Sequence, residues 1–468
     1  MSGEPQSAGA EGEGRASLLA PEPPQRHPWN RFVHWGAFAL MAVGTLIVLN
    51  SLWRHAESGD RQGWARFDPD LLPVLAGFLL LVLAGTVFAL RPEEAEARKL
   101  ILTSVVWTAA LFGALVLCWA EIVGSTAQRQ WAGTPVSSVA SRDAYLAQTI
   151  PGWKPSSPKP FRIPTGIMIQ SVEFLNANNV QVSGFVWQKY GPSTPPNLEK
   201  GVVFPEAVRE AYAQEQVYDV VDGGVETIGW YFAATFRQKF DYGRYPFDRQ
   251  NVWIRMWSRD FARGALLVPD FTSYFTLTPT ELPGIEQQFV YSGWTPIYSG
   301  FSYNLIAYDT SFGLPPAAQR GEFPELYFDL VLKRSFLGPF TDYFIFGIAA
   351  ALLLFAILLL TTSNEDLRTR FGLSTAGVVG SVSGLFFAVI LKHNQIRTSL
   401  GAPATTYSEA VPYILYVLLV LVAVNAVLLA SPINIPAVEY RHNLLPKLLY
   451  WPTLLGLLLV ITFFTFFR

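Results

Sequence analysis

Long apolar runs and short alternating segments divide this chain. Three apolar runs lie near the N-terminus, at Phe32–Trp53, Leu71–Leu90 and Leu100–Ile122. Four more close the chain, at Pro339–Leu360, Phe371–Leu391, Tyr407–Ala430 and Leu448–Phe467. Each has about 20 residues, enough for a helix rising 1.5 Å per residue to cross a hydrocarbon layer of about 30 Å. The pattern therefore predicts seven membrane spans.

Between these two groups, from Gly124 to about Leu337, no stretch is apolar enough to span a membrane. Gly, Pro, Asn and Asp bound short segments in which apolar and polar residues alternate, the period of half-buried strands. The predicted strands are Thr165–Phe174, Val180–Lys189, Thr227–Phe240, Asn251–Trp257, Gln287–Trp294, Pro296–Tyr308 and Leu326–Lys333. Two short helices are expected, at Ala140–Gln148 and Pro205–Gln214. The region is predicted to be an all-β sandwich.

The positive-inside bias gives a predicted orientation. Basic residues in the linker between the second and third runs, with the N-terminal tail, are placed in the cytoplasm, although the 54–66 loop is also basic. We expect four parts: a disordered cytoplasmic tail (1–28), an N-terminal three-helix transmembrane segment (29–123), a periplasmic β-domain (124–337) and a C-terminal four-helix transmembrane domain (338–468). The chain is then expected to be a multi-pass membrane protein.

Composition removes several function classes. A net charge of −2 gives no basic field for nucleic acid. The single cysteine, Cys118, can form no internal disulfide, and the five histidines lack metal-ligand spacing. No ionisable residue sits in the middle of a span, and no nucleophile–His–acid set is evident. We therefore expect no enzyme, no cofactor and no metal.

The stretch Gln238–Phe261 carries the most specific signal, QKFDYGRYPFDRQNVWIRMWSRDF. Its core YPFDRQ resembles the FPFDxQ signature of the pentameric ligand-gated ion channels, the Cys-loop receptor superfamily. The similarity runs from about Ile167 to the C-terminus, through IMIQSVEF, VQVSGFVWQKY, ELYFDLVLKRSFLGPF and TTYSEAVPYILYVLLVLVAV. Gln238 and Val252 occupy the places of the two cysteines in animal receptors, and Glu409 that of a usual acidic residue.

The resemblance, which is to prokaryotic members in particular, implies a homopentamer in the lipid bilayer of the bacterial inner membrane. Its fold would be that of an α+β membrane protein, with an extracellular immunoglobulin-like β-sandwich followed by a four-helix transmembrane bundle. A small-molecule or ionic ligand on the sandwich would open a pore for permeating ions. The N-terminal three-helix segment lies outside the family core, and the polar segment Lys392–Thr406 is longer than the usual loop between the second and third channel helices.

The resemblance also assigns residues that couple the β-domain to the pore. They are Tyr245, Pro246, Phe247 and Asp248 of the signature loop and Arg334 ahead of the first channel helix. A charge at the edge of a low-dielectric membrane is costly unless it is paired, which independently favours an Asp248–Arg334 pair. The alternative is that both are solvated charges near the headgroups.

The second closing run is expected to line the pore. Residues at helical spacing would face the axis: Gly372, Ala376, Val379, Ser383 and Phe386. Val379 and Phe386 suit a gate that closes by dewetting, whereas the alternative is a packed, glycine-rich span. The pore mouth holds Glu365, Asp366, Arg368 and Arg370. In a pore, rings of carboxylates favour cations and rings of guanidinium groups favour anions. Which ion charge this pore selects depends on how these residues are aligned with the family, and cations are weakly favoured.

In the family, agonists bind between subunits in an aromatic cage beneath the hairpin that is Thr310–Pro324 here. The candidates are Trp187, Trp257, Tyr298, Tyr303 and Phe312. Such a cage would suit an amine through cation–π attraction, while a structural role for each ring is the alternative.

A second function is compatible with the same features: a non-conducting sensor whose β-domain binds a ligand and signals through the N-terminal helices. A continuous hydrated axis would separate the channel from the sensor.

Overall fold

A computed structural model gives the structure of this chain. It describes residues 97–124, 131–150, 161–260, 265–288, 291, 293–310, 312–313, 323–364, 368–370, 374–401, 404–433 and 435–467. The predictions for the 1–28 tail and for the spans Phe32–Trp53 and Leu71–Leu90 lie outside these residues. The described chain is mixed α/β, with two sheets and five long apolar helices.

The described residues fall into two compact units. One holds 97–121, 350–387 and 414–467; the other holds both sheets, within 122–349, and residues 388–413. Helices α5 and α7 each contribute residues to both units.

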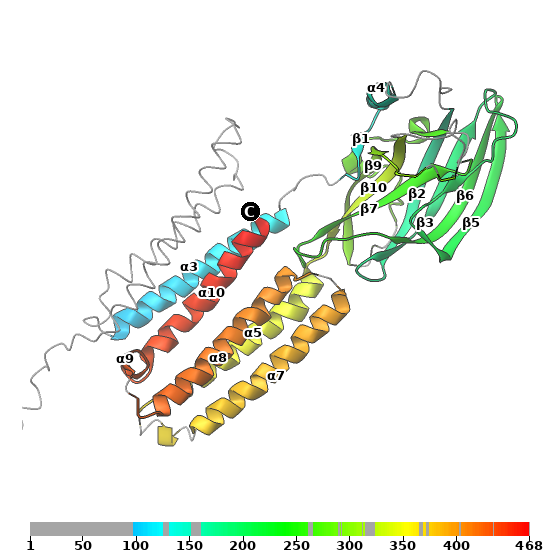
Figure 1. Ribbon diagram of the computed structural model, residues 1–468. Coiled ribbons are helices and arrows are strands. Elements are labelled where there is room, and N and C mark those ends of the chain that lie inside the picture. Colours follow the sequence, from blue (N-terminus) through cyan, green and yellow to red (C-terminus); the bar gives the residue numbers. More distant parts are fainter. Residues whose placement is uncertain are drawn as a thin grey trace, which may run out of the picture. The chain divides into compact units, whose positions relative to one another are not determined.

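Two five-stranded sheets form most of the second unit (Figure 1). Their strand orders are β1-β9-β10-β7-β4 and β5-β6-β3-β2-β8, and every pairing is antiparallel except β2 with β8. The elements are β1 (Thr134–Val136), α4 (Val139–Thr149), β2 (Arg162–Phe174), β3 (Asn179–Tyr190), β4 (Val202–Val203), β5 (Ala207–Asp222), β6 (Val225–Arg237), β7 (Arg249–Ser258), β8 (Leu266–Pro269), η2 (Phe271–Ser273), η3 (Pro279–Glu281), β9 (Trp294–Ile306) and β10 (Phe323–Arg334).

Side chains from both sheets share one hydrophobic core. Ile167 of β2 and Phe232 of β6 belong to it together with Ile254 of β7 and Phe328 of β10, all almost completely buried. The predicted alternation in β7 is confirmed, because Val252, Ile254 and Met256 are buried while the residues between them are half-buried. The predicted helix at Ala140–Gln148 is also confirmed, as α4.

Two predictions for this unit are wrong. Pro205–Gln214 is not a helix, because β5 occupies Ala207–Asp222 and pairs with β6. Its Ala, Glu and Gln favour helix locally, but the hairpin with β6, closed at Gly223 and Gly224, supplies backbone partners that override this preference. Gln287–Trp294 is not a strand among its described residues: Gln287 and Gln288 lie in a turn, and β9 begins only at Trp294.

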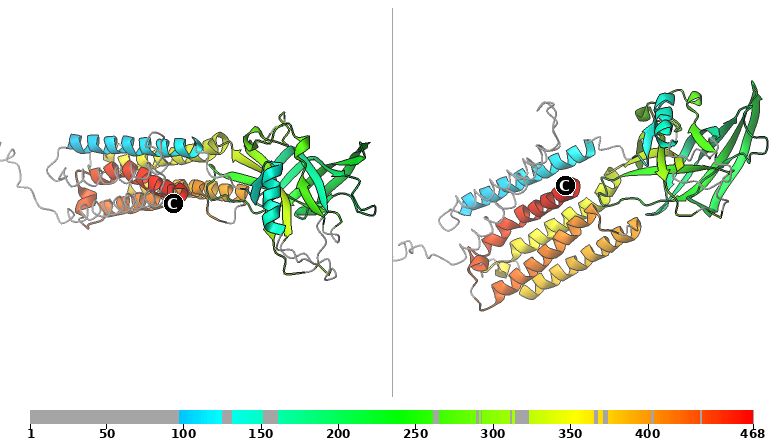
Figure 2. Two further views of the ribbon diagram at one scale, coloured as in Figure 1. Left: turned by 90° about the horizontal axis from the view of Figure 1, so that it is seen from above. Right: turned by 45° about the horizontal axis from the view of Figure 1, so that its top comes forward.

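Five described helices are long and apolar enough to cross a membrane. They are α3 (Ala97–Gly124), α5 (Leu337–Leu360), α7 (Thr375–Leu400), α8 (Ala410–Ala430) with the turn η5 (Tyr407–Glu409) ahead of it, and α10 (Leu444–Phe466), which follows the short α9 (Pro436–Glu439). They match five of the seven predicted spans and suggest a multi-pass membrane protein. Helices α3 and α10 run side by side in both figures (Figures 1 and 2), and the Ser104 hydroxyl donates to the Leu448 carbonyl at 2.6 Å.

The long polar loop predicted at Lys392–Thr406 is mostly wrong. Helix α7 continues through Leu400, because no glycine or proline interrupts residues 392–400. Gly401 then adopts φ 57°, the left-handed conformation that commonly ends helices, and its N–H donates to the Arg397 carbonyl. Only residues 401–406 connect α7 to η5, so this connection is short.

Candidate functional site

The signature loop, residues 238–248, carries the chain from β6 in one sheet to β7 in the other. Gln238 anchors its start: the backbone N–H donates to the Asn178 carbonyl at 2.7 Å, and the side-chain amide donates to the Trp253 carbonyl. Gln238 is buried, and Trp253 adjoins Val252. A side-chain hydrogen bond therefore joins the start of the loop to β7, the strand that follows it.

Asp248 and Arg334 form a bidentate ion pair at the end of this loop. Arg334 Nε lies 2.6 Å from Asp248 Oδ1, and Nη2 lies 2.9 Å from Oδ2. The Asp248 side chain is 1% exposed and that of Arg334 is 14% exposed. Gln250 donates to Asp248 Oδ2 at 2.8 Å and to the Asp241 carbonyl, which fixes the carboxylate from a second side. The pair is buried, and its geometry matches the forked geometry of a strong Arg–carboxylate contact.

Aromatic rings surround the Arg334 guanidinium. Its central carbon lies 4.0 Å from the ring centroid of Trp294, 4.8 Å from that of Tyr245 and 5.9 Å from that of Tyr242. Burial raises the pKa of Tyr242 to about 12 and raises the pKa of Tyr245 further, so both rings are neutral at physiological pH. The cation is thus held by one carboxylate and by the faces of neutral rings.

The same loop contacts the segments that begin two of the apolar helices. The Gly243 carbonyl accepts from the Tyr407 N–H at 2.9 Å, and the Tyr245 carbonyl accepts from the Ser408 N–H at 3.1 Å. The Phe247 ring lies 6.0 Å from that of Tyr407. On the other side Tyr245 packs against Tyr343 of α5, and Phe247 stacks on Phe336. Pro246 is buried and follows a cis peptide bond.

All five candidate coupling residues therefore lie together, and we refer to them as the coupling site. Tyr245, Pro246, Phe247 and Asp248 come from the loop, and Arg334 ends β10 just ahead of α5.

A second charge cluster, which sequence reasoning missed, is centred on buried Glu409 and lies beside Tyr407 and Ser408. Glu409 Oε2 is 2.9 Å from His393 Nε2, 3.0 Å from Arg397 Nη1 and 3.1 Å from the Tyr413 hydroxyl. Its other oxygen accepts from the Thr406 N–H at 3.0 Å, as part of a capping box. His393 and Arg397 are four residues apart on α7, a spacing that places both on one helix face. That spacing is the available signal, and the prediction of a loop at 392–406 obscures it.

The candidate pore residues separate into two groups on α7. Ala376 and Ser383 are exposed within the protomer, whereas Val379 is half-buried. Phe386 is half-buried and its ring lies 5.3 Å from that of Tyr416 on α8, while the next residue, Phe387, is 63% exposed. The face of α7 that packs inward is formed by Val378, Val382 and Val389. Gly372, Glu365 and Asp366 lie outside the described residues; Arg368 and Arg370 are exposed in a short helical turn.

The candidate ligand residues do not form one cage. Tyr303 is fully buried, donates to the Leu267 carbonyl and stacks on Tyr145, so it belongs to the core. Trp187 donates to the carboxylate of Asp270, which follows β8 in the same sheet. Tyr298 is buried beside Trp131.

Only Trp257 and Phe312 come together. Their ring centroids are 6.2 Å apart, and Tyr308, which sequence reasoning missed, lies 5.1 Å from Phe312. The Arg255 guanidinium covers Trp257 at 5.2 Å and is paired with Glu206 and Glu325. The Tyr308 hydroxyl donates to Glu325 at 2.6 Å. We call these residues the aromatic–acidic cluster.

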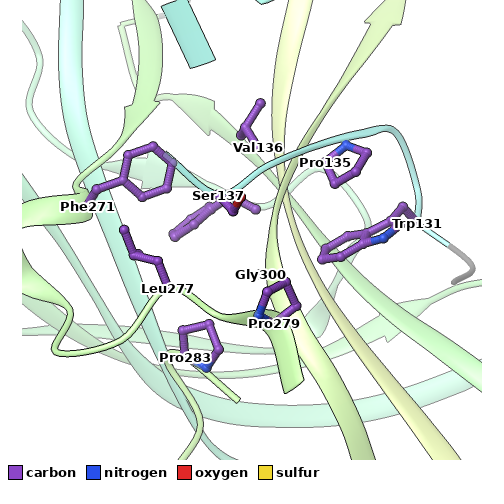
Figure 3. Close-up of a pocket in the computed structure, with 10 residues that line it drawn as sticks. Trp131, Pro135, Val136, Ser137, Phe271, Leu277, Pro279, Pro283 and Gly300 are labelled. Carbon is purple, nitrogen blue, oxygen red and sulfur yellow. The ribbon is translucent and has the colours of Figure 1, made fainter. Parts of the chain in front are cut away.

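A small cavity lies elsewhere in the sheet unit (Figure 3). It has a volume of about 150 Å³ and is mostly apolar, with Trp131, Phe271 and Phe301 among its walls and Pro135, Pro279 and Pro283 around them. One wall, the segment 131–137, is held to the sheet because the Ala132 N–H donates to buried Asp329 at 2.8 Å. Nothing in the sequence pattern marked this cavity, because its walls come from separate segments.

No protein-family model matches this chain, and no curated protein matches it either.

Proposed function

We propose that this protein is a homopentameric ligand-gated ion channel of the bacterial inner membrane. In this proposal the two sheets form a periplasmic immunoglobulin-like β-sandwich, and α5, α7, α8 and α10 form a four-helix transmembrane bundle. The N-terminus is cytoplasmic, and three N-terminal helices supplement the channel. A small-molecule or ionic ligand on the sandwich opens the pore, which favours cations weakly.

The coupling site is the observation that carries the proposal. A buried charge pair is costly to desolvate, so its presence calls for a role beyond stability. Here Arg334 immediately precedes α5, Asp248 ends the signature loop, and the same loop accepts two backbone hydrogen bonds from the start of the α8 segment. A displacement of the loop would therefore act on the beginnings of two helices at once. This is the mechanical link that a ligand-gated pore requires.

The burial of α7 refines the proposed pore lining. Ala376 and Ser383 remain candidates, because both are exposed and small. Phe387 replaces Phe386 as the candidate for the apolar constriction, because Phe386 is engaged with Tyr416 while Phe387 is exposed. Val379 stays a candidate at the edge of the open face.

The aromatic–acidic cluster is the proposed ligand site. Trp257, Tyr308 and Phe312 present three rings, and Glu206 and Glu325 supply two carboxyl groups that share the single Arg255 guanidinium. A cationic amine could lie against the rings and compete with the guanidinium for the carboxylates. Trp187, Tyr298 and Tyr303 are less suited, because each is engaged in other contacts.

One observation favours the alternative, a non-conducting sensor. The Lys333 ammonium donates to the carbonyl of Val123, at the end of α3. Lys333 adjoins Arg334, so the last of the N-terminal helices is tied to the residue next to the coupling site. A signal from the sheets could therefore leave through α3 without any pore opening.

Two measurements test the proposal in order. Native mass spectrometry of the purified protein in detergent should give five copies, and a stable monomer or dimer would overturn the channel architecture. If five copies are found, ion flux into liposomes should be measured for the unmodified protein and for Asp248→Ala. Loss of ligand-evoked flux in an intact pentamer supports coupling through this site, whereas unchanged flux contradicts it.

A further inference from the structure

A cavity in the helix unit contains a polar side chain that lacks a partner. The cavity measures about 330 Å³ and lies among α5, α8, α9 and α10. Its walls are apolar, with Leu358, Leu418, Val422, Val438 and Leu449 among them. Asn425 of α8 also lines it and is 8% exposed. Neither Nδ2 nor Oδ1 of Asn425 has a hydrogen-bond partner within the described part of the chain.

An unpaired amide at this position needs an explanation. Asn425 is five residues from the end of α8, which places it about 8 Å inside an apolar helix. A buried amide without a hydrogen bond is unfavourable, and buried polar groups in native proteins are nearly always paired. Tyr450, which also lines the cavity, is already satisfied, since its hydroxyl donates to the Ala351 carbonyl at 2.8 Å. Polar residues inside membrane-spanning segments commonly mark functional sites.

We propose that this cavity binds a neutral amphiphile whose planar head carries one donor beside one acceptor, as in an aliphatic carboxamide. Such a head pairs with both polar atoms of Asn425 through two parallel hydrogen bonds, whereas a hydroxyl or an ester reaches only one of them well. A charged head is excluded by the apolar walls. The apolar tail fills the rest of the cavity. The whole cavity, about 330 Å³, is about twice the roughly 150 Å³ that accommodates benzene in an apolar protein cavity.

The rim of the cavity gives such a ligand access from the hydrocarbon layer. Leu421, Val424 and Leu449 line it and are 54%, 46% and 49% exposed in the protomer. A molecule dissolved among lipid tails can therefore enter without crossing the polar loops. This site lies in the helix unit and does not depend on the proposed pore, so a protein that conducts no ions would still bind the ligand.

Photolabelling tests the proposal directly. A decanamide carrying a diazirine in its tail is added to the full-length protein in liposomes, illuminated, and the labelled residues are mapped by peptide mass spectrometry. Label should concentrate on the cavity walls, and excess decanamide should displace it while methyl decanoate, which has no donor, displaces it about tenfold less well. Label spread evenly over the exposed faces of the helices would overturn the proposal, as would an unlabelled cavity, since a water molecule would then suffice for Asn425.

Three variants separate the hydrogen bonds from the space. Asn425→Leu keeps the size and removes the amide, so labelling should fall about tenfold. Leu421→Trp keeps the amide and fills the cavity from its rim, so labelling should also fall, even if Asn425→Leu does not fold. Val427→Leu is the matched control, because Val427 is 52% exposed on the same helix but does not line the cavity. Equal labelling of Asn425→Leu and this control would refute the role of the amide.

Discussion

Removing the charge of Asp248 is the sharpest test of the coupling site. Asp248→Asn keeps the shape of the side chain but leaves the Arg334 guanidinium buried without a counter-charge. Breaking a buried pair from one side typically costs about 3–5 kcal/mol. The rings of Trp294 and Tyr245 remain over the guanidinium, so we expect the lower end, about 3 kcal/mol. For a unit of this size that corresponds to a decrease in melting temperature of roughly 6–12 °C.

The assay is thermal unfolding of the purified protein in detergent, followed by circular dichroism in the β region. Asp143→Asn is the matched control, because Asp143 pairs with Arg142 and Arg162 in the same unit but is 44% exposed. An exposed pair contributes about 0–1 kcal/mol, so the control should lose less than about 4 °C. Equal small losses in both variants would refute the reasoning and favour two solvated charges.

A double variant distinguishes the charge from the hydrogen bonds. Adding Arg334→Met to Asp248→Asn removes the uncompensated cation, and replacing a buried pair by apolar groups is often nearly neutral. The double variant should therefore be more stable than Asp248→Asn alone. A further loss instead would mean that the Gln250 hydrogen bonds, and not the buried charge, dominate the effect.

Other predictions concern the core, pH and the pore. Gly166→Ala should cost about 1–3 kcal/mol, because a Cβ there would lie 2.2 Å from the Trp187 ring, whereas Gly191→Ala, with open space around it, should be neutral in the same melting assay. Burial raises the pKa of Asp329 to about 6, above its ordinary value of 3.8. The folded state therefore holds this proton more tightly than the unfolded chain. The resulting contribution to the free energy of unfolding is fully present below about pH 4 and is lost as the pH rises through about 6. The melting temperature of the unmodified protein minus that of Asp329→Asn should therefore fall between about pH 4 and 6 and then level off; a flat difference would contradict the buried position. Phe387→Ala should raise ion leak into liposomes while Phe386→Ala should not, and the reverse order would return Phe386 to the proposed axis.

Short-range sequence patterns predicted most elements of the fold. Period-two alternation identified β7, and the long apolar runs identified five helices. Where local preference and pairing conflicted, the prediction failed: residues 205–214 contain helix-favouring side chains, yet β5 pairs with β6 over its length. At residues 392–400 the error was the opposite, because polar composition suggested a loop although nothing there breaks a helix.

The candidate site was predictable only where a motif carried it. Asp248 and Arg334 are 86 residues apart, and two arguments paired them before the structure did: the resemblance of the loop, and the cost of an unpaired charge at the membrane edge. The aromatic candidates shared a residue type without a motif. Composition does not encode side-chain direction or strand pairing. These place Tyr303 in the core and Trp187 in a hydrogen bond with Asp270, and they place Tyr308 beside Trp257.

The two charge clusters constrain how a signal could pass through the coupling site. Asp248 and Arg334 hold the signature loop, while Glu409, with His393 and Arg397, holds η5. The loop is joined to η5 by two backbone hydrogen bonds, from Tyr407 and Ser408 to the loop carbonyls, and by the ring contact between Phe247 and Tyr407. The Asp248–Arg334 pair is expensive to break and Glu409 is buried with three side-chain partners, whereas a backbone hydrogen bond contributes about 1 kcal/mol net. In the proposed channel the movement should therefore occur at the contacts between the loop and η5, with each cluster moving as a rigid body.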